Sequence, residues 1–201
     1  MKSTPFLFLL TSIFLYESSH NPLFSADPKS LQKLESMVPK KSAEPLDSRD
    51  LSGVDMRSYD LCSSDPKAKV DFKNFNFKGA NFAGMEICHV NFEGANLEQA
   101  NFEGARITSC NFHHVIGPIN FTHACIKYSG FNHAKLAGSV FMGATLESTG
   151  FDYADLKNTK FDQSAMIAVN FYSADLTGYS HEGMRKDRTN FERSIGTGWF
   201  D

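Results

Sequence analysis

Histidines are concentrated in the middle of this 201-residue sequence, where acidic residues are missing. No aspartate or glutamate occurs from Gly104 to Leu146, whereas this stretch holds three basic residues and four histidines. Imidazoles that lie close together can share a borderline metal such as zinc, or gain charge together near about pH 6 and attract anions. The alternative is a solvated row of polar side chains. The candidate binding residues are His113, His114, His133, Arg106, Lys127 and Lys135.

No arrangement of residues in the sequence is typical of catalysis. A glycine-rich phosphate loop, a paired-histidine helix motif, a nucleophile elbow and a serine, histidine and aspartate arrangement do not stand out. The outward aspartates fall at turn positions, where solvation is their ordinary role. We therefore predict a protein that is not an enzyme and that has no cofactor and no metal site.

The overall charge is nearly balanced, with 20 basic and 23 acidic residues and an isoelectric point near 6.2. A general nucleic-acid binder usually has a clearly basic domain. The apolar fraction of 41% lies in the ordinary range for a foldable globular protein. These values favour a folded chain with a protein partner and no nucleic-acid partner.

Residues 1–26 have the features of a signal peptide. Lys2 precedes the apolar run Pro5–Tyr16, which is too short to span a bilayer comfortably, and the small residues Ser25 and Ala26 offer a cleavage point. We expect export to the periplasm, the cell exterior or an organelle lumen, with membrane contact only during export. The alternative is a retained apolar arm that docks on the folded body.

Residues 27–45 are expected to form a short helix and a connector. Asp27 is typical of an N-cap and Pro28 of a first helical turn, and apolar residues recur on one face over Pro28–Val38. Pro39 then ends the turn, and the segment up to Pro45 is polar.

The body of the chain repeats with a period of five residues. Large apolar residues recur at this interval from Phe72 to Phe112 and, after one residue is lost, from Phe121 to Leu176. A small residue, often alanine, lies two positions before each of these centres. Neither the helical period nor the strand period produces this spacing, so the chain must turn every five residues. The pattern extends upstream, across an eleven-residue step before Phe72, through Leu46, Leu51, Met56 and Leu61.

Four such segments would make a square coil of twenty residues, and residue types do match at this larger period. Stacked coils would place equivalent backbones about 4.8 Å apart, so that each coil satisfies the amides of the next. Like side chains would then stack in columns inside the rod. The predicted core consists of Phe72, Phe82, Phe92, Phe102, Phe112, Phe121, Phe131, Phe141, Phe151, Phe161 and Phe171.

The units Ala-Asn-Phe-Glu-Gly at 100–104 and Ala-Asp-Leu-Lys-Asn at 154–158 resemble the pentapeptide-repeat family. The match covers about Leu46 to Leu176. The resemblance implies an all-β fold, a right-handed quadrilateral β-helix in which the central residue and the small residue two places before it point inward. We place this β-helix at 46–178, followed by a partial coil and a C-terminal cap at 179–201.

Some pentapeptide-repeat proteins imitate duplex DNA and occupy DNA gyrase, protecting it from quinolones, so the resemblance implies a second class of function. A duplex mimic needs dense negative charge, whereas this chain has a net charge of -3 and an acid-free middle. We therefore expect a non-enzymatic, exported scaffold or binding protein that presents a rigid surface to a macromolecular partner. Gyrase binding and a metal or pH response of the histidines are the alternatives.

The coil assignment makes specific predictions about neighbouring side chains. His114 and His133 should occupy equivalent corners of successive coils, near about 5 Å apart, with Tyr153 next in the same column. The interval between Phe112 and Phe121 is one residue short, so one side of one coil should be shortened.

The four cysteines are predicted to be free thiols, because the coil assignment places none of them over another. Cys110 should point inward, and Cys62, Cys88 and Cys125 should face outward. Free thiols conflict with the export predicted above, since exported proteins usually form disulfides.

The strict pattern dissolves after Leu176, as is usual for the terminal units of a solenoid. We expect an end cap that uses Tyr179, Trp199 and Phe200. Trp199 and Phe200 could also bury against a second copy of the chain, which would make a homodimer through the C-terminal end.

Overall fold

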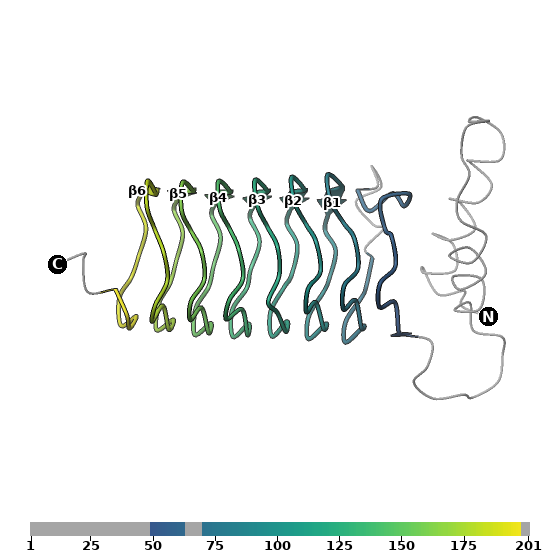
Figure 1. The fold of residues 1–201 in the computed structure, drawn as a ribbon, viewed down its shortest axis with the longest axis horizontal. Coiled ribbons are helices and arrows are strands. Elements are labelled where there is room, and N and C mark those ends of the chain that lie inside the picture. The colour runs from purple at the N-terminus through teal and green to yellow at the C-terminus, as the bar shows by residue number, and fades with distance from the viewer. Residues whose placement is uncertain (1–48, 63–69, 198–201) are drawn as a thin grey trace.

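The computed structural model describes residues 49–62 and 70–197 of the chain. Over these residues the backbone winds into coils that lie side by side along a rod (Figure 1). Three-residue strands, one from each of six coils, pair in chain order as one parallel sheet along one edge of the rod. These strands are β1 (Glu86–Cys88), β2 (Arg106–Thr108), β3 (Cys125–Lys127), β4 (Thr145–Glu147), β5 (Ala165–Ile167) and β6 (Arg185–Asp187).

Successive coils pair on all four sides, which confirms the predicted quadrilateral β-helix. One side is the sheet β1–β6, here called the strand ladder, in which Ile87 lies opposite Ile107. The other three sides are ladders of single parallel bridges, named here after Asn91, Asn96 and Asn101. The Asn91 ladder comprises Asp71, Asn91, Asn111, Gly130, Gly150, Asn170 and Asn190; the Asn96 ladder comprises Asp50, Asn76, Asn96, Ile116, Lys135, Asp155, Asp175 and Ile195; the Asn101 ladder comprises Asp55, Asn81, Asn101, Asn120, Val140, Lys160 and Ser180.

The strands are short because the chain turns at corners in the left-handed backbone region. Gly104 has a φ of 65°, and His114 has a φ of 59° at another corner. Glycine adopts this conformation freely, whereas other residues adopt it at some cost in free energy. The repeated turns therefore limit each pairing segment to a few residues and fix the five-residue period.

The core is a continuous stack of phenylalanine rings. Rings one coil apart stack nearly parallel, with centroids 4.4 Å apart for Phe82 and Phe102 and 4.7 Å for Phe112 and Phe131. Rings on different sides meet edge to face, as Phe102 and Phe112 do at 81°. Every predicted core phenylalanine is buried. Each such side chain contributes about 1.5 to 3 kcal/mol of transfer free energy, which offsets the entropy lost by ordering a thin rod.

The small residues two places before each centre also point inward, as predicted. Ala100 is fully buried, and Cys110 is buried within the same core. The predicted short side begins at Ile116 of the Asn96 ladder, and it ends where Asn120 donates to Asn101 Oδ1 at 3.0 Å across a separation of 19 residues. There, the backbone amide of Ile119 is satisfied by Ser139 Oγ at 3.0 Å.

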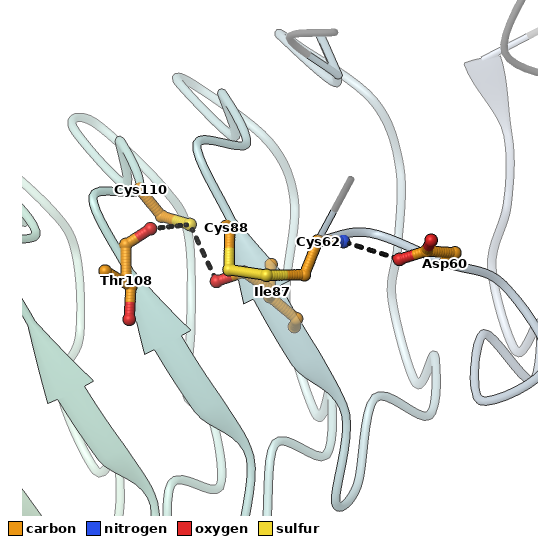
Figure 2. Close-up of a disulfide and its surroundings, with 6 residues drawn as sticks. All are labelled: Asp60, Cys62, Ile87, Cys88, Thr108 and Cys110. Atoms are coloured by element: carbon orange, nitrogen blue, oxygen red, sulfur yellow. Dashed lines mark hydrogen bonds between the residues drawn. A yellow bond between two sulfur atoms is a disulfide. The ribbon is translucent and has the colours of Figure 1, made fainter. Parts of the chain in front are cut away.

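The prediction of four free thiols was wrong for one pair, because Cys62 and Cys88 form a disulfide (Figure 2). Their Cα atoms lie 4.5 Å apart, and the two residues are separated by 26 positions in sequence. Leu61 pairs with Ile87, so the residues that follow them are neighbours in the column. Leu61 pairs with Ile87 before the eleven-residue step and Asp71 pairs with Asn91 after it, so parallel pairing between coils is present on both sides of the step. Cys110 and Cys125 are free, as predicted.

Several predictions fall outside the described residues. These are the signal peptide, the helix over Pro28–Val38, its connector, the first repeat positions 46–48 and the C-terminal pair Trp199 and Phe200. Tyr179 is described and packs against the core. Its hydroxyl is buried without a hydrogen-bond partner in the described part of the chain, and burial raises the pKa of Tyr179 to about 12. Within 49–62 and 70–197, no helix has the length and hydropathy of a membrane span.

Candidate functional site

Two histidines and a tyrosine form a stack of exposed rings at one corner of the rod. The ring centroids of His114 and His133 are 5.1 Å apart with an angle of 9° between the ring planes. His133 and Tyr153 are 5.0 Å apart at 3°. These residues occupy the same left-handed corner in three successive coils, with φ values of 59°, 59° and 58°. The separation predicted from the coil assignment is therefore confirmed, and we call these three residues the ring stack.

His113 differs from its neighbour His114 because it is half-buried. A Cβ atom added to Gly130 would lie 2.3 Å from His113 Nε2, so the imidazole lies across the space that this glycine leaves open. Burial, helped by the neighbouring His114, holds the pKa of His113 below its ordinary value. The folded protein therefore favours the neutral form of this histidine.

Asp152 lies in the column of His113, one residue before Tyr153. Burial raises the pKa of its carboxyl above the ordinary value. Its Oδ1 atom accepts a hydrogen bond from Asn170 Nδ2, and its backbone amide donates to Asn132 Oδ1 at 3.2 Å. This carboxylate is thus committed to the neighbouring coils rather than directed at the ring stack.

Lys135 and Ile116 lie beside the ring stack on the Asn96 ladder, where they pair directly. Both are exposed, and Ile116 has 37% of its surface accessible. Lys135 forms no ion pair with any residue in the described ranges. Next along this side, Pro118 and Ala137 are exposed as well.

Arg106 and Lys127 lie on a different side of the rod from Lys135. Arg106 begins β2 and Lys127 ends β3, so both belong to the strand ladder. Lys127 Nζ contacts Glu147 Oε2 at 2.8 Å, and this pairing raises the pKa of Lys127 and lowers that of Glu147. The six predicted binding residues are therefore not one site. The structure brings together His113, His114, His133 and Lys135, and it places Arg106 and Lys127 elsewhere.

Two glutamates before the acid-free stretch, Glu93 and Glu98, are paired with lysines. Lys73 Nζ contacts Glu93 Oε1 at 2.7 Å, and Lys78 Nζ contacts Glu98 Oε2 at 2.7 Å. The hydrogen bond from Lys73 lowers the pKa of Glu93. These two glutamates, which lie two coils below Lys135, are thus paired with other cations, and Lys135 forms an ion pair with neither of them.

The chemistry available at the ring stack is hydrogen bonding, stacking and charge. Within the described residues, no group of three or more histidine, cysteine, aspartate or glutamate side chains could hold a metal ion. The stacked faces cover one another, so the ring edges, with their nitrogens and the tyrosine hydroxyl, are presented to solvent. The corner can thus contact a partner through these groups.

Apolar residues on the outer surface were missed by reasoning from sequence. Ile116 and Met142 lie in outward columns and have 37% and 40% of their surfaces exposed. The five-residue register assigns these positions to solvent, so apolar residue types there were a usable signal. Tyr172 was also missed. Its ring centroid lies 5.7 Å from that of Tyr153, and the guanidinium carbon of Arg193 lies 5.5 Å from the centroid of the Tyr172 ring.

Comparison with protein-family models finds pentapeptide repeats in eight copies, over residues 68–104, 89–116 and 131–163. The comparison with curated proteins finds no match.

Similar solved structures are pentapeptide-repeat proteins. A trypsin-treated variant of QnrB1, a plasmid-mediated fluoroquinolone resistance protein, is 14% identical over 63% of this chain and 71% of its own, with a TM-score of 0.39. HetL, involved in heterocyst differentiation regulation in the cyanobacterium Nostoc sp. strain PCC 7120, is 14% identical over 74% and 86%, with a TM-score of 0.31. A protein from the Arabidopsis thaliana thylakoid lumen is 23% identical over 58% of this chain and 65% of its own, with a TM-score of 0.31. These likenesses concern the fold alone.

Proposed function

We propose, on the premise that this chain is a pentapeptide-repeat protein, that it is a non-enzymatic, exported scaffold whose β-helix surface binds a macromolecular partner. One observation carries the proposal: exposed rings and an unpaired lysine lie side by side on a rigid core. The ring stack of His114, His133 and Tyr153 borders Lys135 and Ile116, none of which is used to hold the coils together by an ion pair in the described part of the chain.

Rigidity supports binding by this surface. The phenylalanines beneath it are fully buried and packed in register over successive coils. A preformed surface loses little conformational entropy when it docks, so modest contacts along several coils can give specific affinity.

The disulfide supports the exported part of the proposal. Disulfides form and persist in oxidising compartments and are rare where thiols are kept reduced. The Cys62–Cys88 bond therefore removes the conflict between free thiols and a leader sequence. Export predicts that these two cysteines resist alkylation in the intact native compartment until a reductant is added. Immediate alkylation of both would contradict it.

Affinity capture with matched variants tests partner binding. The chain beginning at Asp27 is used as bait in extracts of its native compartment, beside Lys135→Glu and Arg106→Glu. Both changes reverse one exposed cation of the acid-free stretch, but Arg106 lies on the strand ladder. We expect a partner that is retained by the parent and by Arg106→Glu and is lost with Lys135→Glu. No partner, or equal capture by all three, would contradict the proposal, and recovery of DNA gyrase would favour the duplex-mimic alternative.

A further inference from the structure

The charge around Lys135 is not balanced by the protein itself. The sequence has no carboxylate from Gly104 to Leu146, and the glutamates two coils below, Glu93 and Glu98, are held by lysines at 2.7 Å. The aspartate one coil above on the same ladder, Asp155, lies 3.7 Å from Lys157 Nζ. The ammonium group of Lys135 is therefore available to a carboxylate from outside the chain.

Two exposed side chains with apolar surface lie near Lys135. Ile116 is its partner on the Asn96 ladder and is 37% exposed, and Tyr153 at the neighbouring corner is 53% exposed. The corresponding ladder positions in the two preceding coils are Asn76 and Asn96. Exposed apolar side chains beside an unpaired cation favour a ligand that combines negative charge with apolar groups.

We infer that the strip formed by His114, Ile116, His133, Lys135 and Tyr153, here called the acid-free strip, docks an acidic protein segment that carries apolar side chains, and does so more tightly in mild acid. This inference rests on the proposed function, because it names the chemistry of the partner. The segment's carboxylates face Lys135 and the imidazole edges, and its apolar groups cover Ile116 and Tyr153.

A protein segment fits the strip better than a nucleic acid does. Nucleic-acid binding depends on several lysines or arginines that follow the phosphates, with affinity that grows with their number. At neutral pH the strip has one permanent cation, Lys135, and its neighbours on the Asn96 ladder are the apolar Ile116 and the carboxylate Asp155. The other two cations of the acid-free stretch, Arg106 and Lys127, lie on the strand ladder and are therefore not part of the strip.

The pH dependence follows from the groups that surround the imidazoles. Histidine is the side chain that gains charge as the pH falls from about 8 to 5. His114 and His133 face each other, with half-buried His113 beside His114 in the chain and the uncharged Tyr153 above. The charged neighbours are Lys135 on the Asn96 ladder and, in the column of His113, Glu93 and Asp152.

Both carboxylates are already engaged, Glu93 by Lys73 and Asp152 by Asn170. Glu93 and Asp152 also interact electrostatically with the histidines, but each proton that a histidine takes up still adds one positive charge to this surface, so an acidic segment is attracted more strongly. Three histidines and Lys135 make the largest cationic state of this surface.

A peptide-binding measurement tests the inference. The probe is a fluorescein-labelled peptide of alternating glutamate and leucine, and the matched neutral control replaces each glutamate by glutamine. Anisotropy titrations of the full chain are made near pH 7.5 and near pH 5.5. We expect the acidic peptide to bind about tenfold or more tightly than the neutral one, and its affinity to rise severalfold at the lower pH.

Matched variants locate the binding. Lys135→Glu should weaken the acidic peptide about tenfold or more, whereas Arg106→Glu should change it less than about twofold. A His114→Gln, His133→Gln double variant should keep the binding at pH 7.5 and lose most of the gain at pH 5.5. All four substituted positions are exposed, and an unchanged thermal midpoint shows that each variant is folded.

Three outcomes overturn the inference: equal binding of both peptides, no effect of Lys135→Glu, or tighter binding of duplex DNA than of the acidic peptide. If affinity capture recovers a partner that depends on Lys135 while the acidic peptide fails to bind, the proposed function stands and the acidic chemistry of the partner is wrong. If the peptide binds through Lys135 but capture recovers nothing, the inference about chemistry stands and the proposed function does not.

Discussion

The coils before Gly104 and the acid-free coils after it share one core and differ in what covers it. In the first region, Lys73 pairs with Glu93 and Lys78 with Glu98 across successive coils, and a disulfide ties Cys62 to Cys88. In the second region, the outer columns hold stacked rings, exposed apolar groups and the unpaired Lys135. The rod therefore stabilises one part of its surface internally and leaves another part free for contacts.

The comparison teaches that the outer columns can vary without any change in the fold. Inside both regions phenylalanines stack at similar spacings, 4.4 Å for Phe82 and Phe102 and 4.7 Å for Phe112 and Phe131. Outward residues contribute little to burial, so their types are free to serve other purposes. The predictions that follow test where the two regions are alike and where they differ.

Removal of one core ring should have the largest effect and should be similar in both regions. Phe82→Ala and Phe131→Ala each delete a fully buried ring, so each should lower the free energy of unfolding by about 3 to 5 kcal/mol. Urea denaturation measures this. Tyr153→Ala, at an exposed position, is the control and should cost far less. A large difference between the two phenylalanine variants would show that the core is not uniform.

Loss of the disulfide should destabilise only the first region. The Cys62→Ser, Cys88→Ser double variant removes a cross-link between residues 26 positions apart, for which about 2 to 4 kcal/mol is expected. Because each coil contacts only its neighbours, amide hydrogen exchange should speed up in the first coils and stay unchanged in the acid-free coils. Cys125→Ser is the matched control. Uniform acceleration along the rod would contradict the expected local effect.

Acid should weaken the acid-free region through His113. Burial holds the pKa of His113 below its ordinary value, so the neutral form is favoured in the folded state. The stability linked to this group is present above its unfolded pKa of about 6.5 and is lost as the pH falls below that value. His113→Gln should reduce the loss of stability between about pH 7.5 and 5.5, as measured by chemical denaturation.

Two further variants check the cause of this pH effect. Gly130→Ala places a methyl group 2.3 Å from the present position of His113 Nε2, so it should expel the ring and raise the pKa of His113 toward its ordinary value, as followed by NMR titration. The His113→Gln, Gly130→Ala double variant should show no further change in the pH dependence of stability beyond that of His113→Gln, because the ring that the methyl group would expel is already absent. A pKa of His113 that does not move in Gly130→Ala would rule out burial as the cause.

Ion pairs should give the smallest difference between the regions. Lys78→Gln breaks a half-exposed pair with Glu98 and should cost roughly 0.2 to 1 kcal/mol at low salt, less at high salt. Lys135→Gln breaks no ion pair of the described residues and should be close to neutral at any salt concentration. Thermal denaturation of both variants at two salt concentrations makes the comparison. An equal, salt-sensitive loss in both would mean that Lys135 has a carboxylate partner after all.

Most of the fold could be predicted because one period determines many contacts. The five-residue spacing assigns inward and outward residues, and the twenty-residue coil places His114 over His133, as the structure does. The disulfide was missed although the same arithmetic contained it. Leu61 and Ile87 belong to one column, so the residues that follow them, Cys62 and Cys88, are neighbours when the register is continued across the long step.

The candidate site was predicted less well, because residue type and sequence distance do not say which side of the rod a residue occupies. Arg106 and Lys127 were grouped with the histidines for their shared stretch of sequence, yet they lie on the strand ladder. The half-buried position of His113 depends on the missing side chain at Gly130, a relation between two coils that composition does not reveal. The exposure of Ile116, in contrast, could have been predicted, because the five-residue register assigns its position to solvent.

The pairing between β3 and β4 repeats residue by residue, so one coil is a unit that can be duplicated. Ile126 lies over Leu146, and the following turn begins again at an equivalent residue. A duplicate of residues 131–150 could therefore be spliced in without disturbing its neighbours, lengthening the rod by one rung of about 4.8 Å and adding one more imidazole to the row. The number of coils therefore determines the length of the surface that the rod presents.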